Sequence, residues 1–234
     1  MTIRLLRPLF ACGLLAVSGL ALSATPSAFT ATYDVLQGGS PLGRATVTLA
    51  PAGNGEWTYH KQVQGTGGMA ALLGASLDEN SRFRWKGDVP EAISYDYRLD
   101  AAIKAKKRHM AVDWSSNQVT VDEGKGPLNY PAQPGMVERN TLALAIGLAL
   151  RDGQRQIALP VGVKQRVETQ NFRAGGKEAV TVPAGSFQAT RVDRSDADQG
   201  FNAWYVPEKY PLPVKLQQKD GGDITMQLVS YKAD

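Results

Sequence analysis

From residue 29 onward, hydrophobic and polar side chains alternate along the chain with a period of two. Phe29, Ala31, Tyr33 and Val35 are separated by polar residues, and the run ends in the turn sequence Gly-Gly-Ser-Pro at 38–41. This alternation puts every second side chain on one face, so it predicts half-buried β-strands joined as hairpins. Similar runs predict about a dozen short strands, at 29–35, 44–49, 57–63, 83–85, 93–99, 104–114, 118–121, 157–167, 179–182, 187–192, 201–206, 212–217 and 224–231.

Two segments break the alternation. Residues 140–152 have a helical apolar face, with Asn140 and Thr141 as candidate caps and Gly153 as a stop signal, so they predict the main α-helix. Residues 68–74, Gly-Met-Ala-Ala-Leu-Leu-Gly, are apolar without alternation, and they predict one or two helical turns or an apolar loop. The expected fold is mostly β: a single antiparallel, strongly curved sheet or barrel, with the helix packed against it or across its mouth.

Residues 124–135 are rich in glycine and proline and separate an N-terminal set of strands from the helix and a C-terminal set. We interpret them as a long connection within one sheet system, with a linker between two domains as the alternative.

The first two dozen residues have the pattern of a secretory signal peptide. Arg4 and Arg7 precede an apolar stretch at 9–22, which is too short for a comfortable bilayer span and runs into small residues at 21–24. We expect cleavage near Ser23 and Ala24, which leaves one β-rich domain at 25–234 in the periplasm or outside the cell. A weaker alternative is a lipoprotein cleavage site ending at Cys12, but that cut would leave most of the apolar stretch on the mature protein.

Composition narrows the classes of partner. Residues 1–24 hold two basic and no acidic side chains, so the remaining 210 residues carry 24 basic against 22 acidic side chains, a net charge of +2. That balance argues against nucleic acid as a partner. Because Cys12 is the only cysteine, the mature chain has no disulfide and no thiolate metal ligand. No second apolar run approaches the length of a transmembrane helix.

Several short motifs resemble one bacterial envelope family, the domain of unknown function 3108. They are Tyr33-Asp34-Val35 with Gly39 and Leu42-Gly43, Val89-Pro90 with Tyr95, the turn sequence Val-Pro-Ala-Gly-Ser-Phe at 182–187 with Arg191, and Trp-Tyr-Val-Pro at 204–207 with Leu-Pro-Val-Lys at 212–215. The resemblance spans nearly all of the mature chain and implies an extracytoplasmic β domain, with no catalytic residues to transfer. The expected sheet is also similar, at the level of fold alone, to the periplasmic lipoprotein carriers LolA and LolB.

Charged residues offer few candidate sites. His60 and His109 lie on separate predicted strands without metal-ligand spacing, so we expect no metal and no cofactor. Two basic trios alternate along predicted strands, and they would form one basic stripe if those strands were neighbours, or a solvated face balanced by acidic residues. The trios are Arg82, Arg84 and Lys86, and Lys104, Lys106 and Arg108.

These patterns support three hypotheses about function. The leading one is a non-enzymatic envelope protein that binds an apolar or lipid-like ligand or assists envelope assembly. Strand aromatics would then line a cavity instead of filling the core, and apolar residues of the two helical segments would contact the ligand. Those residues are Met69, Leu72, Leu73, Leu142, Ile146 and Leu150. The alternatives are a scaffold that binds another envelope protein through exposed strand edges, and a hydrolase of a cell-wall or lipid substrate that uses His60 or His109.

Overall fold

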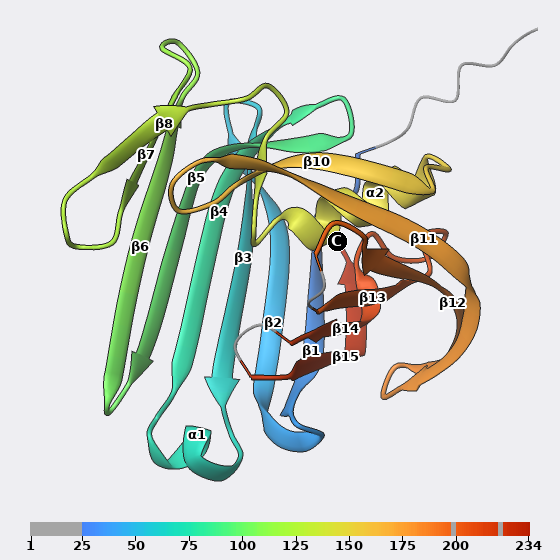
Figure 1. Cartoon of the computed structure of the whole chain (residues 1–234). Coiled ribbons are helices and arrows are strands. Elements are labelled where there is room, and N and C mark those ends of the chain that lie inside the picture. The colour runs from blue at the N-terminus through green and yellow to red at the C-terminus, as the bar shows by residue number, and fades with distance from the viewer. Residues whose placement is uncertain (1–24, 198–199, 220–221) are drawn as a thin grey trace, which may run out of the picture.

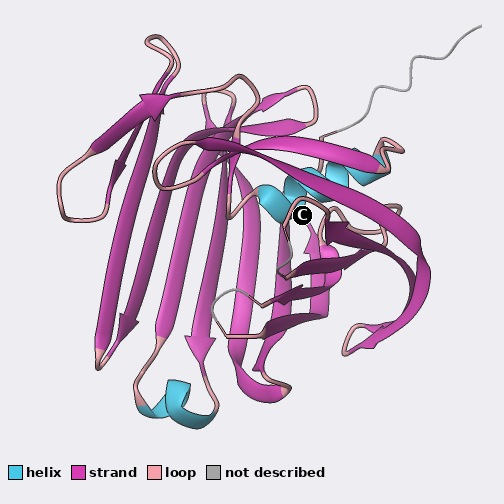
Figure 2. Ribbon diagram, viewed as in Figure 1, coloured by secondary structure: helices cyan, strands magenta, loops and turns pink. Residues whose placement is uncertain are grey.

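The computed structural model describes residues 25–197, 200–219 and 222–234, so the predicted signal peptide lies outside the described residues. Within these described residues, fifteen strands and two helices follow one another, and Figures 1 and 2 show how they are arranged. They are β1 (Phe29–Gln37), β2 (Ser40–Gly53), β3 (Glu56–Gly65), α1 (Gly68–Leu72), β4 (Ser76–Lys86), β5 (Val89–Ala101), β6 (Lys104–Asp113), β7 (Gln118–Asp122), β8 (Leu128–Pro131), β9 (Val137–Glu138), α2 (Leu142–Arg151), β10 (Gln156–Gly162), β11 (Val167–Val182), β12 (Gly185–Arg194), β13 (Phe201–Tyr205), β14 (Pro213–Gln218) and β15 (Ile224–Ala233).

All of these strands belong to one sheet, in the order β8 down to β1 and then β15 down to β9. Every neighbouring pair is antiparallel except β9 and β10. The first and last strands lie side by side in the middle of the sheet, where Phe29 pairs with Ala233. The predicted mostly-β fold with an antiparallel, curved sheet is therefore confirmed.

The sheet rolls up so that β5 meets the segment before β9. The amide of Ala92 on β5 donates to the carbonyl of Met136 at 2.9 Å, and the Gly135 amide donates to the buried carboxylate of Glu91 at 2.8 Å. Strands β6, β7 and β8 extend beyond this contact, as the left side of Figure 1 shows. The result is a barrel-like roll that is closed by a short contact instead of a continuous ladder.

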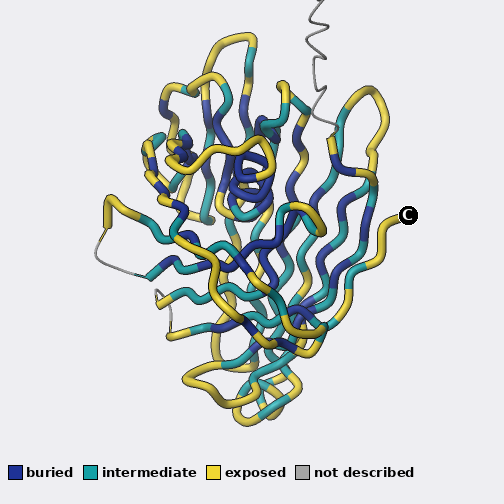
Figure 3. The backbone as a smooth tube through the Cα atoms, turned by 90° about the vertical axis from the view of Figure 1, so that its right-hand side faces the viewer, coloured by how far each residue is buried: buried dark blue, intermediate teal, exposed yellow. Residues whose placement is uncertain are grey.

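Helix α2 lies inside the roll. Eight of its ten residues are buried, because sheet surrounds it on more than one side; in Figure 3 it is the dark-blue coil enclosed by strands. Leu144 and Leu148 belong to a core cluster with residues of β1 to β4 and β11 to β15, whereas Leu142, Ile146 and Leu150 belong to a cluster with residues of β9 to β13. A helix that is apolar all round suits such burial. A third apolar cluster lies between β5, β6, β7 and β8.

The start of α2 differs from the expected cap. Neither Asn140 nor Thr141 caps the helix with its side chain; instead the carboxylate of Glu138 accepts hydrogen bonds from both of their amides, at 2.7 and 3.1 Å. The Asn140 side chain points to the sheet and donates to Tyr59 and Ser81. At the other end Gly153, with a φ of +82°, ends the helix as predicted.

The structure has more strand than the alternation predicts, for a physical reason. Strand β4 begins at Ser76, whereas the alternation predicts only 83–85. The prediction is too short because the buried face carries Glu79 and Ser81, where a hydrophobic residue is expected. Strand β8 lies within the glycine- and proline-rich segment 124–135, which joins two parts of one sheet. Neither α1 nor α2 is long enough to cross a bilayer, and the described residues include no other helix.

Candidate ligand-binding cavity

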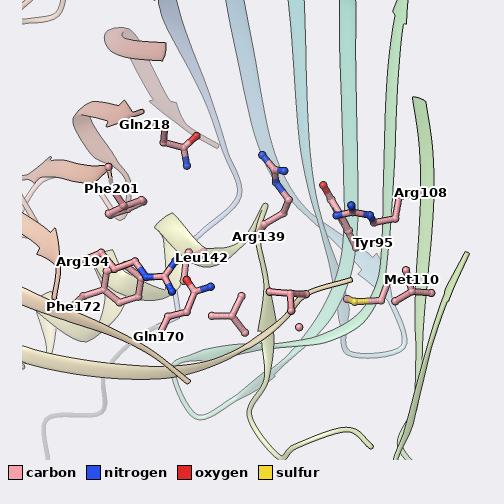
Figure 4. Close-up of a pocket in the computed structure, with 15 residues that line it drawn as sticks. Tyr95, Arg108, Met110, Arg139, Leu142, Gln170, Phe172, Arg194, Phe201 and Gln218 are labelled. Carbon is pink, nitrogen blue, oxygen red and sulfur yellow. The ribbon is translucent and has the colours of Figure 1, made fainter. Parts of the chain in front are cut away.

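A cavity of about 300 Å³ opens between β5 to β7 on one side and β10 to β14 on the other (Figure 4). This volume is at the lower end of the range of roughly 300–1,000 Å³ that is usual for small-molecule sites. Apolar and polar side chains share its wall. The larger apolar side chains are Met110, Val121, Leu142, Val161, Val163, Phe172 and Phe201, and the polar ones are Tyr95, Arg108, Arg139, Gln170, Arg194 and Gln218.

A polar row crosses the inner face of the sheet beside this cavity. Strand register places Lys61, Glu79, Tyr97 and Arg108 next to one another on β3, β4, β5 and β6. The row continues to Glu123, just beyond β7, which accepts a hydrogen bond from Arg108 at 2.7 Å. Because side chains of paired residues project from the same face, this row forms a charged band within a mostly apolar interior.

Glu79 is the centre of that band. Its carboxylate has no exposed surface and lies 2.5 Å from the Lys61 ammonium and 2.6 Å from the Tyr95 hydroxyl, which donates to it. Burial alone would raise the pKa of Glu79, but Lys61 and Arg139 stabilise the charged form and lower the pKa below its ordinary value. Glu79 is therefore an ionised carboxylate in the interior, held by two cations.

The pKa of Glu138 is shifted in the opposite direction, upward. Burial raises the pKa of Glu138, although the Asn140 amide and the hydroxyl of Ser81 hydrogen-bond to it and oppose that shift. Its role is structural, because it accepts the amides that begin α2 and so fixes the segment 138–141 against β4. Arg139 lies between Glu138 and Asn140, which one of these hydrogen bonds joins.

Arg139 projects from this fixed segment into the cavity. In Figure 4 it stands between Arg108 and Arg194. Its side chain is 53% exposed although strands enclose it, because it faces the cavity. The Nε atom lies 3.5 Å from Glu79, and the guanidinium lies 5.8 Å from the centre of the Tyr97 ring. Burial would lower the pKa of Arg139, but Glu79 raises it, so the group stays charged.

A second, smaller cavity of about 60 Å³ lies on the other side of Arg139, toward β1 to β3. Four residues line both cavities: Arg139, Leu142, Phe201 and Gln218. Its remaining wall is mostly aromatic and aliphatic and includes Tyr33 and Tyr59. Arg139 and the first residue of α2 therefore lie at the junction of the two spaces.

Comparison with known proteins gives the family. Residues 29–229 match the family described as "Protein of unknown function (DUF3108)". The chain belongs to the DUF3108 family. No curated protein matches it.

One solved structure supports the same fold for this DUF3108 chain. It is the crystal structure of a beta-barrel-like protein of domain of unknown function DUF1849 from Brucella abortus, with a TM-score of 0.51 and 12% sequence identity. The match covers 90% of the DUF3108 chain and 99% of the other. At this identity the likeness concerns the fold alone. The family and the structural neighbour indicate no enzyme class.

The sequence-predicted ligand contacts of the DUF3108 chain fall in two distant places. Leu142 lines both cavities, and Ile146 and Leu150 are buried in the core beside it. Met69 and Leu72 are 65% and 80% exposed on α1, and Leu73 follows them. In Figure 1, α1 lies at the opposite end of the roll from α2. The structure does not bring the two groups together, because the long β3–β4 hairpin carries α1 away from the cavity.

The two basic trios do not form one stripe. Strand β5 lies between β4 and β6, and the trios point to opposite faces of the sheet. Arg82, Arg84 and Lys86 lie on the outer face, where Glu56 and Glu91 pair with them. Lys104, Lys106 and Arg108 follow the inner face in line with the buried Met110, and only Arg108 reaches the larger cavity.

Both histidines lie on the outer face of the sheet, each beside an aspartate. His60 is 2.8 Å from Asp78, and His109 is 2.7 Å from Asp96. Neither lines the larger cavity. Within residues 25–197, 200–219 and 222–234, no three side chains of the metal-binding types come together as a metal site.

Sequence reasoning named Arg108, as part of a basic stripe, but missed the other charged and amide side chains of the cavity. Arg139 and Gln170 come from segments that look solvent-exposed in a one-dimensional pattern, and Arg194 ends a strand. One signal was present: Glu79 and Ser81 occupy the same face as Phe83, where a purely structural strand would carry apolar residues. Polar residues at inward positions mark the site.

Proposed function

We propose that this DUF3108 protein is a non-enzymatic protein of the bacterial envelope that binds an apolar, lipid-like ligand in the cavity beside α2. The observation that carries the proposal is a cavity in the interior of the roll whose wall has apolar side chains from both halves of the sheet and from α2, beside polar ones. A concave, preformed and mostly apolar space with a few polar groups is the usual character of a ligand site.

Export belongs to the same proposal. Residues 1–24 would direct secretion and be removed near Ser23 and Ala24, so that the domain folds in the periplasm. The mass of the mature protein recovered from a periplasmic fraction tests this part. A protein that retains residues 1–24 in the cytoplasm would contradict it.

Ligand binding is tested first on the unmodified protein. The mature protein is purified from a bacterial periplasm without detergent and analysed by native mass spectrometry and organic extraction. We expect a stoichiometric apolar molecule, together with saturable uptake of an environment-sensitive apolar dye such as 1-N-phenylnaphthylamine. A clean apo mass and no dye uptake would contradict the proposal and favour the alternative of a protein-interaction scaffold.

A matched pair of variants locates the site. Leu142→Trp adds bulk where the two cavities meet, so it is expected to reduce dye binding at least tenfold. Leu72→Trp adds the same bulk on the exposed α1 and is expected to leave binding unchanged. Urea unfolding of both variants separates loss of the cavity from loss of the fold. Loss of binding only in Leu72→Trp would move the site to α1.

A further inference from the structure

We infer that the cavity selects single-chain amphiphiles with an anionic head, and that Arg139 binds the carboxylate or phosphate. This inference rests on the proposed function and names the class of ligand. The shared chemistry of these heads is a compact anion whose oxygen atoms accept two hydrogen bonds from one guanidinium.

The Arg139 guanidinium is available to a ligand. Its only carboxylate partner among the described residues is Glu79, 3.5 Å from Nε, and Glu79 is already bound by Lys61 and Tyr95. No hydrogen bond within the described part of the chain uses the Arg139 guanidinium. Half of the side chain remains accessible to the cavity. A ligand anion would supply a second partner, hydrogen-bonded to the guanidinium beside its ion pair with Glu79.

The charged side chains that line the cavity are positive. Arg108, Arg139 and Arg194 line it, and none of the described lining residues is acidic. Arg194 is paired with Asp196, and Arg108 with Glu123, each at 2.7 Å. Arg108 shares Glu123 with Lys164, and Arg139 shares Glu79 with Lys61, so both are incompletely compensated. Arg139 has the longer contact with its carboxylate, 3.5 Å. A cation of this kind in a partly enclosed space favours an anionic ligand.

The backbone at Arg139 is held in place by its neighbours. Arg139 lies between Glu138, which holds the start of α2, and Asn140, whose side chain donates to Tyr59 and Ser81. Its backbone is fixed before a ligand arrives, so binding costs little ordering of the main chain. Leu142, Phe172 and Phe201 line the same cavity and provide an apolar wall for one hydrocarbon chain.

The decisive experiment compares ligands that share a chain and differ in the head. Isothermal titration of the mature protein uses decanoate, decyl phosphate, decanol and inorganic phosphate at neutral pH. We expect both anionic amphiphiles to bind at least tenfold more tightly than decanol, and inorganic phosphate at millimolar concentration not to displace them. Equal affinity for decanol and decanoate would overturn the inference and leave the proposed function intact. Displacement by inorganic phosphate would assign the site to free anions and also overturn it.

The variants assign the effect to one residue. Arg139→Gln is expected to remove the preference for anions, so that decanoate and decanol bind this variant with similar affinity, whereas Arg139→Lys retains part of the preference. Arg82→Gln, a matched change on the outer face, is expected to have no effect. The comparison of ligands on the wild-type protein needs no variant. It therefore tests the inference even if Arg139→Gln does not fold. If none of the alkyl compounds bound, decanol included, the proposed function itself would fail.

Discussion

The carboxylate of Glu91 accepts a hydrogen bond from the backbone amide of Gly135 at 2.8 Å and also pairs with Arg84 and Lys86. Glu91 is on β5 and has no exposed surface, whereas Gly135 precedes β9, at the far edge of the sheet. The interaction lies beside the Ala92–Met136 hydrogen bond. One buried acid therefore fastens together two regions that the strand ladder does not connect.

Replacing Glu91 is expected to weaken the contact between β5 and the segment before β9. Glu91→Ala leaves the Gly135 amide without a partner, so we expect the free energy of unfolding to fall by about 2–3 kcal/mol, since burying an unsatisfied group costs about 1–3 kcal/mol and the acid also holds two cations. Urea unfolding followed by tryptophan fluorescence measures the change. The matched control is Glu56→Ala, which breaks the more exposed Glu56–Arg82 pair on the outer face and is expected to cost less than about 1 kcal/mol. Equal losses in both variants would refute a special role for Glu91.

Acid is expected to weaken the interior charge cluster. The folded-state pKa of Glu79 is below its ordinary value of 4.5. Its ionised form therefore contributes stability that is present above pH 4.5 and is lost as the pH falls through the folded pKa. Glu79→Gln leaves Lys61 and Arg139 without their carboxylate, so at neutral pH we expect a loss on the order of 3–5 kcal/mol.

The pH dependence of that loss is the informative measurement. The stability gap between wild type and Glu79→Gln is expected to narrow as the pH falls below 4.5 and the wild-type carboxylate becomes protonated. Urea unfolding at several pH values gives the gap directly. A gap that stayed constant across these pH values would show that Glu79 acts through packing and not through charge.

Gly147 in α2 is expected to resist substitution. A Cβ atom at this position would lie 2.0 Å from the carbonyl oxygen of Pro211, so Gly147→Ala must push the helix away from the β13–β14 connection. We expect a loss of about 1–3 kcal/mol, although alanine favours helix by about 1 kcal/mol over glycine. Gly176→Ala, where no atom lies within 4 Å and φ is not positive, is the control and should be neutral. Thermal unfolding of both variants makes the comparison.

Much of the architecture is readable from the alternation, and the arrangement of the site is not. The pattern from Phe29 to Val35 predicts β1, and the apolar spacing from Leu142 to Leu150 predicts α2. Strand order depends on pairings between distant segments, such as β1 with β15, which leave no local pattern. In the same way, Arg139 resembles any surface arginine in sequence, because the wall that surrounds it comes from segments far along the chain.

The adjacency of β1 and β15 leads to a prediction about connectivity. Because Phe29 and Ala233 are paired neighbours, a short glycine–serine linker can join residue 234 to residue 25. A circular permutant opened between Gly67 and Gly68, beside the exposed α1, is expected to fold cooperatively. One opened between Ile146 and Gly147, inside the buried α2, is expected not to fold. Equal cooperativity of the two permutants in urea would contradict the role given to α2.

The same adjacency affects the time at which the sheet can be completed. Strand β15 is the last of the fifteen strands to be synthesised, but its place is in the middle of the sheet, between β1 and β14. Until residues 224–233 have emerged from the ribosome, β1 has one unpaired edge and the two halves of the sheet are not joined through their strands. The N-terminal strands β1 to β8 and the C-terminal strands β9 to β14 can pair within their own halves before that point, but the sheet becomes continuous when β15 pairs with both β1 and β14.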